Sequence, residues 1–483
     1  MNKKSVILSA GAISIIAIPS CCGAKKQASP NIVIIHCDQL AAWPLGCYGG
    51  DEVGTPNIDG LAAEGVVMTN FYANTPVSTP SRGCMMSGLY PNEHGAYKND
   101  MQIRQDIPTF ASELRDAGYQ TGYCGKWHLD GNPKRPGWDI RGADMGWSDR
   151  SAMYAFGHYK TITDDRDGYP VFSNDVSPDA EHYPTDWFTS KAIEFIDAHR
   201  KGPFCVMLSI PDPHAPYLVR EPYASMYAPE KMKIPDSFIQ EPRNDNFLYW
   251  ESREKADKKS GKTEYETIRE NLRFDKSQYF GEIKCIDDNV GKVVNYLKKK
   301  RLYDNTIIVF TADHGDMMGE HARMAKAVPF ESAARIPMII RFPHTIAGGQ
   351  VCRHVASMID FYPTILSLAG VQRKGSVSGK DMSALFGAQA QDGEWREVAF
   401  LRSYSQNYPW ICAVTPTMKL IYGEKDAPGE GLLLDRAADP EESLNYFHDP
   451  KYADVVSELS RQIKEYCIGH NDPHWTWLKD RIK

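Results

Sequence analysis

The chain has 483 residues and a formal net charge of −7 at pH 7, with 42% apolar and 24% charged residues. This length favours one large domain with a smaller one, and the ordinary composition excludes a disordered chain and a multispan membrane protein. Because the charge is mildly negative and no basic block occurs, a nucleic-acid partner is not expected.

The N-terminus has the pattern of an export signal over residues 1–21. Two lysines precede the apolar run 6–18, and small residues follow it. The run 18–21, Ile-Pro-Ser-Cys, also resembles a bacterial lipobox, in which Cys21 would become the lipidated first residue; a plain cleaved signal is the alternative. No other stretch is long and apolar enough to span a bilayer. We therefore expect an exported protein, periplasmic or held at the outer membrane as a lipoprotein, with no other membrane attachment.

Residues 28–372 alternate apolar runs with helical patterns. Continuous apolar and β-branched runs predict buried strands at 31–36, 119–126, 203–210, 306–311 and 336–342. Apolar residues at helical spacing predict helices at 55–62, 110–117, 185–199, 278–300 and 361–368. The patterns at 130–183 and 241–275 predict a loop-rich region and a charged surface insertion. The alternation predicts an α/β fold, with a large, mainly parallel sheet sandwiched by helices.

The pattern changes after residue 372. Short apolar runs predict antiparallel strands at 398–402, 410–414, 419–422 and 431–435. Residues 453–467 predict a helix that packs on them. Residues 373–483 are therefore expected to form a smaller α+β subdomain beside the larger domain of residues 28–372.

Polar pairs follow two of the predicted strands. Asp38 and Gln39 come after the first strand, and Asp313 and His314 come after the strand at 306–311. Side chains at the carboxyl ends of such strands face the crevice where α/β sheets bind ligands. Each residue alone could simply cap the next helix, but the two pairs together indicate a metal site. Carboxylate and amide oxygens favour Ca²⁺ or Mg²⁺, and the imidazole also suits Mn²⁺ or Zn²⁺.

A second set of side chains could bind a tetrahedral anion and move its protons. Lys126 and His128 follow the strand at 119–126, and His214 follows another predicted strand. Lys326 lies downstream of the second polar pair. Two cations and two proton-transfer groups would suit an oxyanion.

These motifs surround residues 78–83, Ser-Thr-Pro-Ser-Arg-Gly. This stretch matches the (Cys/Ser)-x-Pro-Ser-Arg signature of the type I sulfatases, and 118–128 matches their second signature. Further matches lie at 31–49, 211–216, 313–319 and 330–337. The five-residue signature alone would occur by chance in many chains, whereas the ordered set would not. The chain therefore resembles the formylglycine-dependent, type I sulfatases of the alkaline phosphatase superfamily, in their Ser-type form.

The resemblance implies that Ser78 is converted to formylglycine by a serine-type sulfatase-maturating enzyme. An ordinary serine would leave a stable sulfo-serine after attack on a sulfate ester. A hydrated aldehyde has two hydroxyls: one, ionised by the metal, forms a covalent sulfo-enzyme intermediate, and the other then expels sulfate.

The resemblance also implies roles for the remaining residues. Arg82 would hold the formylglycine, and His128 would assist the proton transfers of its hydrate. Lys126 and Lys326 would contact sulfate oxygens, and His214 would serve the leaving-group oxygen.

The metal set departs from the one most common in sulfatases, three Asp and one Asn, usually with Ca²⁺. The matching residues here are Asp38, Gln39, Asp313 and His314, joined by Ser78 after its conversion. This Gln and His combination also occurs in relatives that include phosphonate monoester hydrolases. Ca²⁺ is the expected ion, with Mg²⁺ and Mn²⁺ as alternatives, and a phosphonate monoester or phosphodiester hydrolase is the alternative enzyme.

The organic part of the substrate should contact 130–183 and 215–275, where Trp and Arg are frequent. The residues concerned are Trp138, Arg141, Trp147, Arg150, His158, Arg166 and Arg220. Such side chains stack on sugars and pair with acidic groups, although the Trp could equally pack under loops. We expect an O-sulfate on a host or algal glycan, with Arg220 as a substrate-binding residue beside Lys126, His214 and Lys326. A glycan-binding lipoprotein with unmodified Ser78 is the non-enzymatic alternative.

Overall fold

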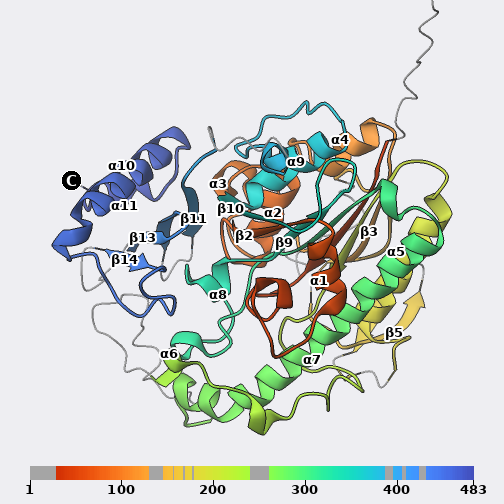
Figure 1. The fold of residues 1–483 in the computed structure, drawn as a ribbon, viewed down its shortest axis with the longest axis horizontal. Coiled ribbons are helices and arrows are strands. Elements are labelled where there is room, and N and C mark those ends of the chain that lie inside the picture. The colour runs from red at the N-terminus through yellow and green to blue at the C-terminus, as the bar shows by residue number, and fades with distance from the viewer. Residues whose placement is uncertain are drawn as a thin grey trace, which may run out of the picture.

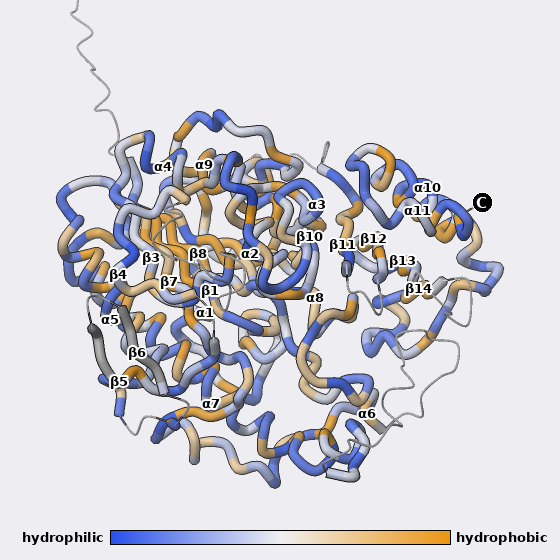
Figure 2. Tube along the Cα trace, turned by 180° about the vertical axis from the view of Figure 1, so that it is seen from behind, coloured by the Kyte–Doolittle hydropathy of each residue, from blue (hydrophilic) through white to orange (hydrophobic). Residues whose placement is uncertain are grey.

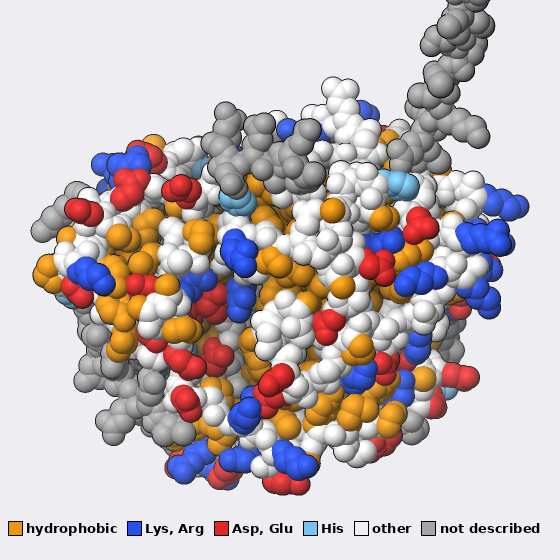
Figure 3. Space-filling view, viewed as in Figure 1, with side chains coloured by type: hydrophobic (Ala, Val, Ile, Leu, Met, Phe, Trp, Pro, Cys, Tyr) orange, Lys and Arg blue, Asp and Glu red, His pale blue; other side chains and the backbone are white. Residues whose placement is uncertain are grey.

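The computed structural model describes residues 29–129, 145–155, 157–166, 169–173, 175–176, 179–239, 260–386, 395–404, 409–423 and 431–482. The predicted export signal, Trp138, Arg141 and the side chain of Arg166 lie outside this description. Within it, no helix combines the length and the apolar character needed to cross a bilayer. Charged side chains of both signs are intermingled on the face shown in Figure 3.

A large central sheet has the strand order β10-β2-β9-β8-β1-β7-β3-β4. Its strands are β1 (Asn31–Cys37), β2 (Val66–Tyr72), β3 (Gln120–Lys126), β4 (Asp149–Tyr154), β7 (Phe204–Ile210), β8 (Thr306–Ala312), β9 (Met338–Arg341) and β10 (Gln350–Ser357). All neighbouring pairs are parallel except those of β9, which runs antiparallel to β2 and β8. β1, β7 and β8 are buried at every residue, as their uninterrupted apolar runs predict.

Helices pack around this sheet, as Figure 1 shows. They are α1 (Pro56–Ala63), α2 (Ser78–Ser87), α3 (Pro91–His94), α4 (Phe110–Asp116), α5 (Pro184–His199), α6 (Asp236–Ile239), α7 (Glu264–Lys299), α8 (Glu331–Ala334) and α9 (Phe361–Leu368). α7 packs against both α1 and α5, and α2, α4 and α9 form a second group. The predicted α/β fold is confirmed.

Two regions differ from the sequence prediction. α7 begins at Glu264, so 264–275 is helical and not part of a surface insertion. A capping box starts it: Thr263 Oγ1 accepts from the Glu266 N–H, and the Glu266 carboxylate accepts from the Thr263 N–H. The region 130–183, predicted to be loop-rich, contains β4 and a two-stranded sheet of β5 (Thr161–Arg166) and β6 (Tyr169–Ser173). β4 begins with Asp149 and Arg150, and β5 ends with three charged residues, so neither strand has the uninterrupted apolar run that marks a buried strand.

The C-terminal region forms the predicted antiparallel sheet. Its strands are β11 (Ala399–Ser403), β12 (Trp410–Val414), β13 (Met418–Gly423) and β14 (Leu432–Asp435). α10 (Ala453–Gly469) packs on β12 and β13, and α11 (Trp475–Leu478) follows it. Figure 2 shows hydrophobic residues concentrated in the central strands of the large sheet and in this smaller one. The domain boundary at 372/373 stays a prediction.

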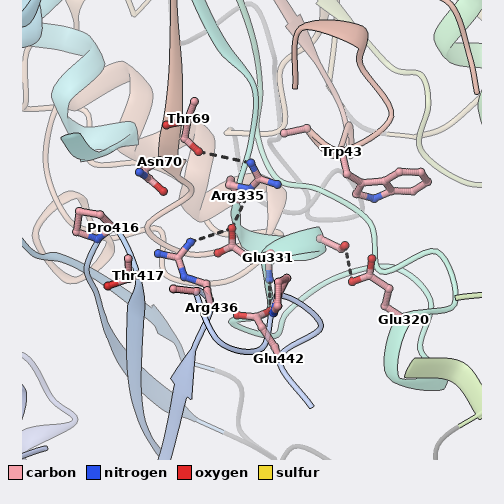
Figure 4. Close-up of a pocket in the computed structure, with 14 residues that line it drawn as sticks. Trp43, Thr69, Asn70, Glu320, Glu331, Arg335, Pro416, Thr417, Arg436 and Glu442 are labelled. Carbon is pink, nitrogen blue, oxygen red and sulfur yellow. Dashed lines mark hydrogen bonds and ion pairs between the residues drawn. The ribbon is translucent and has the colours of Figure 1, made fainter. Parts of the chain in front are cut away.

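A charged cluster around a cavity of about 450 Å³ joins the two parts (Figure 4). Glu331 of α8 accepts from Arg335 at 2.8 Å, from Arg436 at 3.1 Å and from Lys419 at 2.8 Å. Glu442 accepts from Lys419 at 2.7 Å and from the backbone N–H of Glu331 at 2.7 Å. Since Lys419 and Arg436 belong to the C-terminal part, Glu331 ties that part to the large sheet.

Candidate active site

Ser78 is the first residue of α2, a helix that is buried at every position. Its Oγ lies 3.0 Å from His314 Nε2 and 3.4 Å from Asp38 Oδ1. The unpaired N–H groups and the dipole at a helix N-terminus favour negative charge. An oxyanion at position 78 would therefore be stabilised by the helix that carries it.

The ends of β1 and β8 bring together the two predicted metal pairs. The strands are parallel neighbours with Cys37 opposite Ala312, so Asp38 and Asp313 leave the sheet side by side. Ligand atoms of Asp38, Asp313 and His314 lie within 4.8 Å of one another, and all three residues are buried. His314 Nδ1 is 3.0 Å from the Gly315 carbonyl oxygen, which leaves Nε2 facing Ser78. Two carboxylates and an oriented imidazole fit a divalent cation.

Gln39 adopts a left-handed backbone conformation, with φ of 67°, two residues after the end of β1. Such a conformation is uncommon for a residue other than glycine and occurs often at functional sites. Its backbone N–H donates to Asp313 Oδ1 at 3.0 Å, and Nε2 donates to Asp316 Oδ2. Its Oε1 accepts from Lys326 Nζ at 2.6 Å. The amide oxygen of Gln39 is thus turned toward the Lys326 ammonium.

The Arg82 guanidinium lies between the two carboxylates and is 1% exposed. Its Nε donates to Asp313 Oδ2 at 3.0 Å, and Nη2 donates to Asp38 Oδ2 at 3.2 Å. Nη1 donates to the Lys126 carbonyl oxygen and to Ser209 Oγ, both at 2.8 Å. Burial alone would raise the pKa of Asp38, but Lys126 and the other positive groups outweigh it and hold that pKa low.

Lys126 ends β3 with its ammonium buried in the site. Nζ donates to Asp38 Oδ2 and lies 3.1 Å from His158 Nε2. Burial lowers the pKa of Lys126 to about 8. The preceding Gly125 has φ of +113°, and a Cβ there would overlap the carbonyl oxygen of Ser209 on β7. Only glycine allows β3 to approach β7 so closely at this point.

His214 and His158 stack face to face, with ring centroids 3.4 Å apart and planes 6° apart. His214 Nε2 lies 2.5 Å from Lys326 Nζ, and Nδ1 is 2.8 Å from the Ala215 carbonyl oxygen. Burial lowers the pKa of His214 to about 2, so this ring is neutral near pH 7. The two histidines and two lysines form one continuous row. The sequence placed His158 only in a broad substrate region, and no local signal marked it as a site residue.

A buried ion cluster holds the two histidine-bearing segments together. Lys160 Nζ donates to Asp212 Oδ1 at 2.7 Å and to Glu282 Oε1 at 2.5 Å. The Tyr183 hydroxyl donates to the other Asp212 oxygen at 2.7 Å. Lys160 is two residues from His158, and Asp212 is two residues before His214. No pattern in the sequence marks these residues as a cluster.

His128 also has a left-handed backbone conformation, with φ of 60°, two residues after Lys126 at the end of β3. Its backbone carbonyl oxygen accepts from Thr79 Oγ1 at 2.9 Å, and its Nε2 lies 3.7 Å from Asp100 Oδ1. Burial, and then the charge of Lys126, lower the pKa of His128. The backbone of His128 is thus held to Thr79, the residue that follows Ser78.

Two residues of the predicted substrate region have other contacts. Arg220 donates to both carboxylate oxygens of Asp186, at 2.8 and 3.0 Å, and its guanidinium covers Tyr223. This pairing favours a structural role, and substrate binding by Arg220 stays a prediction. Trp147 is 1% exposed and packs edge-on against Tyr123 at 5.2 Å. Trp147 therefore belongs to the core, in agreement with the alternative that the Trp residues pack under loops.

Comparison with known proteins identifies the family. The family model described as Sulfatase matches residues 30–371. The chain belongs to the sulfatase family. The C-terminal part of the sulfatase, residues 319–468, also matches the model described as N-sulphoglucosamine sulphohydrolase, C-terminal.

Relatives of this sulfatase match over nearly its whole length. It is 28% identical to an N-acetylglucosamine-6-O-sulfatase of Bacteroides thetaiotaomicron, with 98% of its chain and 92% of the relative covered. It is 30% identical to an uncharacterised sulfatase of Escherichia coli K12, with 93% and 91% covered. It also matches a solved structure in complex with its substrate D-glucosamine-2-N,6-O-disulfate, with 25% identity, a TM-score of 0.73, and 92% and 99% covered. The protein is an enzyme, a type I sulfatase of the alkaline phosphatase superfamily.

Proposed function

We propose that this sulfatase hydrolyses O-sulfate esters of carbohydrates from host or algal glycans, using a formylglycine formed from Ser78 and a covalent sulfo-enzyme intermediate. The position of Ser78 carries this proposal: its Oγ lies at a helix N-terminus, 3.0 Å from His314 Nε2. Relatives whose names specify sulfated sugars support the substrate class.

One divalent metal, with Ca²⁺ expected, would be held by Asp38, Asp313, His314 and the Gln39 amide oxygen. When bound, it would supply Lewis acidity that lowers the pKa of a hydroxyl at position 78. Two carboxylates and an imidazole within 4.8 Å of one another support this assignment.

The side chains of the chain itself bind the sulfate group and move protons. Arg82, fixed by Asp38 and Asp313, orients the group at position 78. Lys126 Nζ and Lys326 Nζ lie beside the two stacked histidines and would hold the negative sulfate oxygens. His214 Nδ1 holds the proton of the neutral ring against the Ala215 carbonyl oxygen, so Nε2 would accept a proton from Lys326 Nζ, 2.5 Å away, and pass it to the leaving oxygen.

We also propose that a serine-type maturating enzyme acts on Ser78 and that the protein is exported, to the periplasm or to the outer membrane through Cys21. The N-terminal sequence supports export. Metabolic labelling with a radioactive fatty acid tests the anchor: label should enter the wild type and be absent from Cys21→Ala. Absence of label from the wild type would favour the alternative, a plain cleaved signal without a lipid anchor.

The central experiment joins mass spectrometry to an activity panel. Protein produced with a serine-type maturating enzyme should yield a Ser78 peptide lighter by two hydrogen atoms, and should release sulfate from sulfated mono- and disaccharides. Ser78→Ala should be inactive. Turnover of phosphonate monoesters or phosphodiesters only would establish the alternative enzyme. An unmodified peptide with sugar binding but no turnover would establish the glycan-binding alternative.

A further inference from the structure

A cavity of about 930 Å³ lies where α3 meets the C-terminal helices α10 and α11. These elements face one another in both Figure 1 and Figure 2. Side chains from the large and small parts of the molecule line the cavity, among them Tyr97, Arg104, Tyr404, His474 and Trp477. None of these residues belongs to the catalytic row described above.

Aromatic rings form much of the cavity wall. Tyr97 is 40% exposed, and its ring meets that of Tyr404 edge-on at 5.6 Å. On the other side, Trp477 meets the ring of His474 at 5.6 Å. An aromatic ring held by its neighbours, with one side open, offers a rigid apolar surface at low entropic cost. The C–H face of a sugar ring packs well on such a surface.

The polar groups of the cavity are already balanced by partners. Arg104 donates from Nε to Asp106 at 3.0 Å and from Nη1 to the Glu93 carbonyl oxygen at 3.2 Å. The Tyr404 hydroxyl donates to Asp472 at 3.0 Å. The wall therefore presents no cation without a counter-charge among these groups. This charge balance suits an uncharged sugar better than a second sulfate or a uronate.

One loop forms both the cavity wall and the rim of the active site. Asn99 Oδ1 accepts from the backbone N–H of Thr79, next to Ser78, at 3.1 Å. Asp100 Oδ1 lies 3.7 Å from His128 Nε2. Tyr97 is two residues from Asn99, a span of at most about 7 Å. A glycan that places its sulfated unit at Ser78 could thus place a neighbouring unit against Tyr97.

We propose that this cavity binds an uncharged sugar unit that adjoins the sulfated unit of the substrate. This inference rests on the proposed function and specifies it: the preferred substrate is an oligosaccharide, not a free sulfated monosaccharide. Tyr97 and Trp477 supply the stacking surfaces, and the loop from Tyr97 to Asp100 sets the distance to the sulfate.

Activity on substrates of two lengths tests the cavity. Tyr97→Ala and Trp477→Ala should lower kcat/KM for a sulfated tetrasaccharide at least about tenfold more than for an aryl sulfate, because only the longer substrate reaches the rings. Ile468→Ala is the matched control, since Ile468 is 53% exposed on α10 and does not line the cavity. Equal losses on both substrates would overturn the proposal.

A binding measurement separates this proposal from the proposed function, because it needs no turnover. Saturation-transfer NMR on the protein with unmodified Ser78 would use neutral tetrasaccharides of the agarose and N-acetyllactosamine types. Contact in the wild type that is lost in Tyr97→Ala supports the cavity even if no sulfate is released. Absence of contact in the wild type, or contact that persists in both alanine variants, overturns it. Failure of the proposed function would instead appear as no sulfate release from any substrate.

Discussion

At the scale of single residues, the orientation of the Gln39 amide depends on Asp316. This carboxylate accepts from Gln39 Nε2, from the Tyr217 hydroxyl at 2.6 Å, and from the backbone N–H groups of Met318 and Ala325 at 3.0 and 2.9 Å. An acceptor facing the amide nitrogen leaves the amide oxygen, the proposed metal ligand, on the opposite side, where it now accepts from Lys326 Nζ at 2.6 Å. Asp316 is therefore a positioning residue.

Asp316→Asn should weaken Ca²⁺ binding about 10- to 100-fold, because an asparagine NH₂ facing Gln39 Nε2 would favour rotation of the Gln39 amide. Isothermal titration on the protein with unmodified Ser78 measures this without any activity assay. Asp304→Asn is the control, since Asp304 is 87% exposed and precedes β8, at the opposite end of that strand from the site. Unchanged affinity in Asp316→Asn would show that the Gln39 amide needs no such partner.

His158→Ala should lower kcat/KM for sulfate esters about tenfold or more, because His214 loses the ring stacked on it and Lys126 loses its neighbour. His158→Asn should restore part of kcat/KM, since it keeps a polar group beside Lys126. His182→Ala is the control, as His182 is exposed and pairs with Asp179. If kcat/KM survives in His158→Ala, the stacked pair has no part in turnover.

Some contacts of the candidate site could be predicted from the sequence, and others could not. Asp38 and Asp313 could be brought together in advance, because the ends of neighbouring parallel strands meet at one edge. His158 and Asp316 could not, because their roles depend on rings and amides that approach only in three dimensions. No residue spacing in the sequence predicts that the segment after β4 folds back over His214.

At the scale of elements, the same limit applies to strands. β1, β7 and β8 are continuous apolar runs and were predictable, whereas β2 and β10 were not predicted. β2 contains Thr69 and Asn70, which are only partly buried, and β10 exposes Val351 and Arg353. Strands near a sheet edge are less apolar, so they lack the pattern of a buried strand. The sequence predicted helix α7, but not its start, because its first turns are charged and lack an apolar periodicity.

Lys160 joins three elements, since its ammonium bridges the segment before β5, the loop after β7 and helix α7. Burial raises the pKa of Glu282, and its Oε2 has no partner in the described part of the chain. The Lys160 ammonium therefore balances the charge of both Asp212 and Glu282. Lys160→Met should cost about 3–5 kcal/mol of unfolding free energy, because it leaves a buried carboxylate without its cation.

Thermal denaturation measures this loss. The control Lys262→Met removes an exposed pair with Glu270 and should cost no more than about 1 kcal/mol. Equal shifts in the two variants would mean that the buried cluster contributes nothing beyond a surface ion pair.

At the scale of the whole molecule, the two sheets are joined by the Glu331 cluster (Figure 4). Glu331→Gln keeps the size of the side chain and removes the charge that balances Lys419 and Arg436. We expect a loss of about 3–5 kcal/mol, because both cations are largely buried and lose this counter-charge.

Limited proteolysis shows which part of the molecule loses stability in Glu331→Gln. Cleavage in Glu331→Gln should begin in the C-terminal part, while the large sheet resists longer. The control Glu458→Gln changes an exposed charge on α10 and should not alter the cleavage pattern. Uniform cleavage along the whole chain of Glu331→Gln would argue against a docking role for the cluster.

The burial of Ser78 also dictates when it can be modified. Its side chain is 1% exposed, and its neighbour His314 comes from a strand 236 residues later in the chain. An enzyme cannot reach this hydroxyl once β8 has joined β1 in the sheet. The proposed conversion to formylglycine would therefore have to occur on the nascent or unfolded polypeptide, before β8 pairs with β1. Folded protein made in a host without the maturating enzyme would stay inactive when that enzyme is added afterwards, and only unfolding would reopen the site.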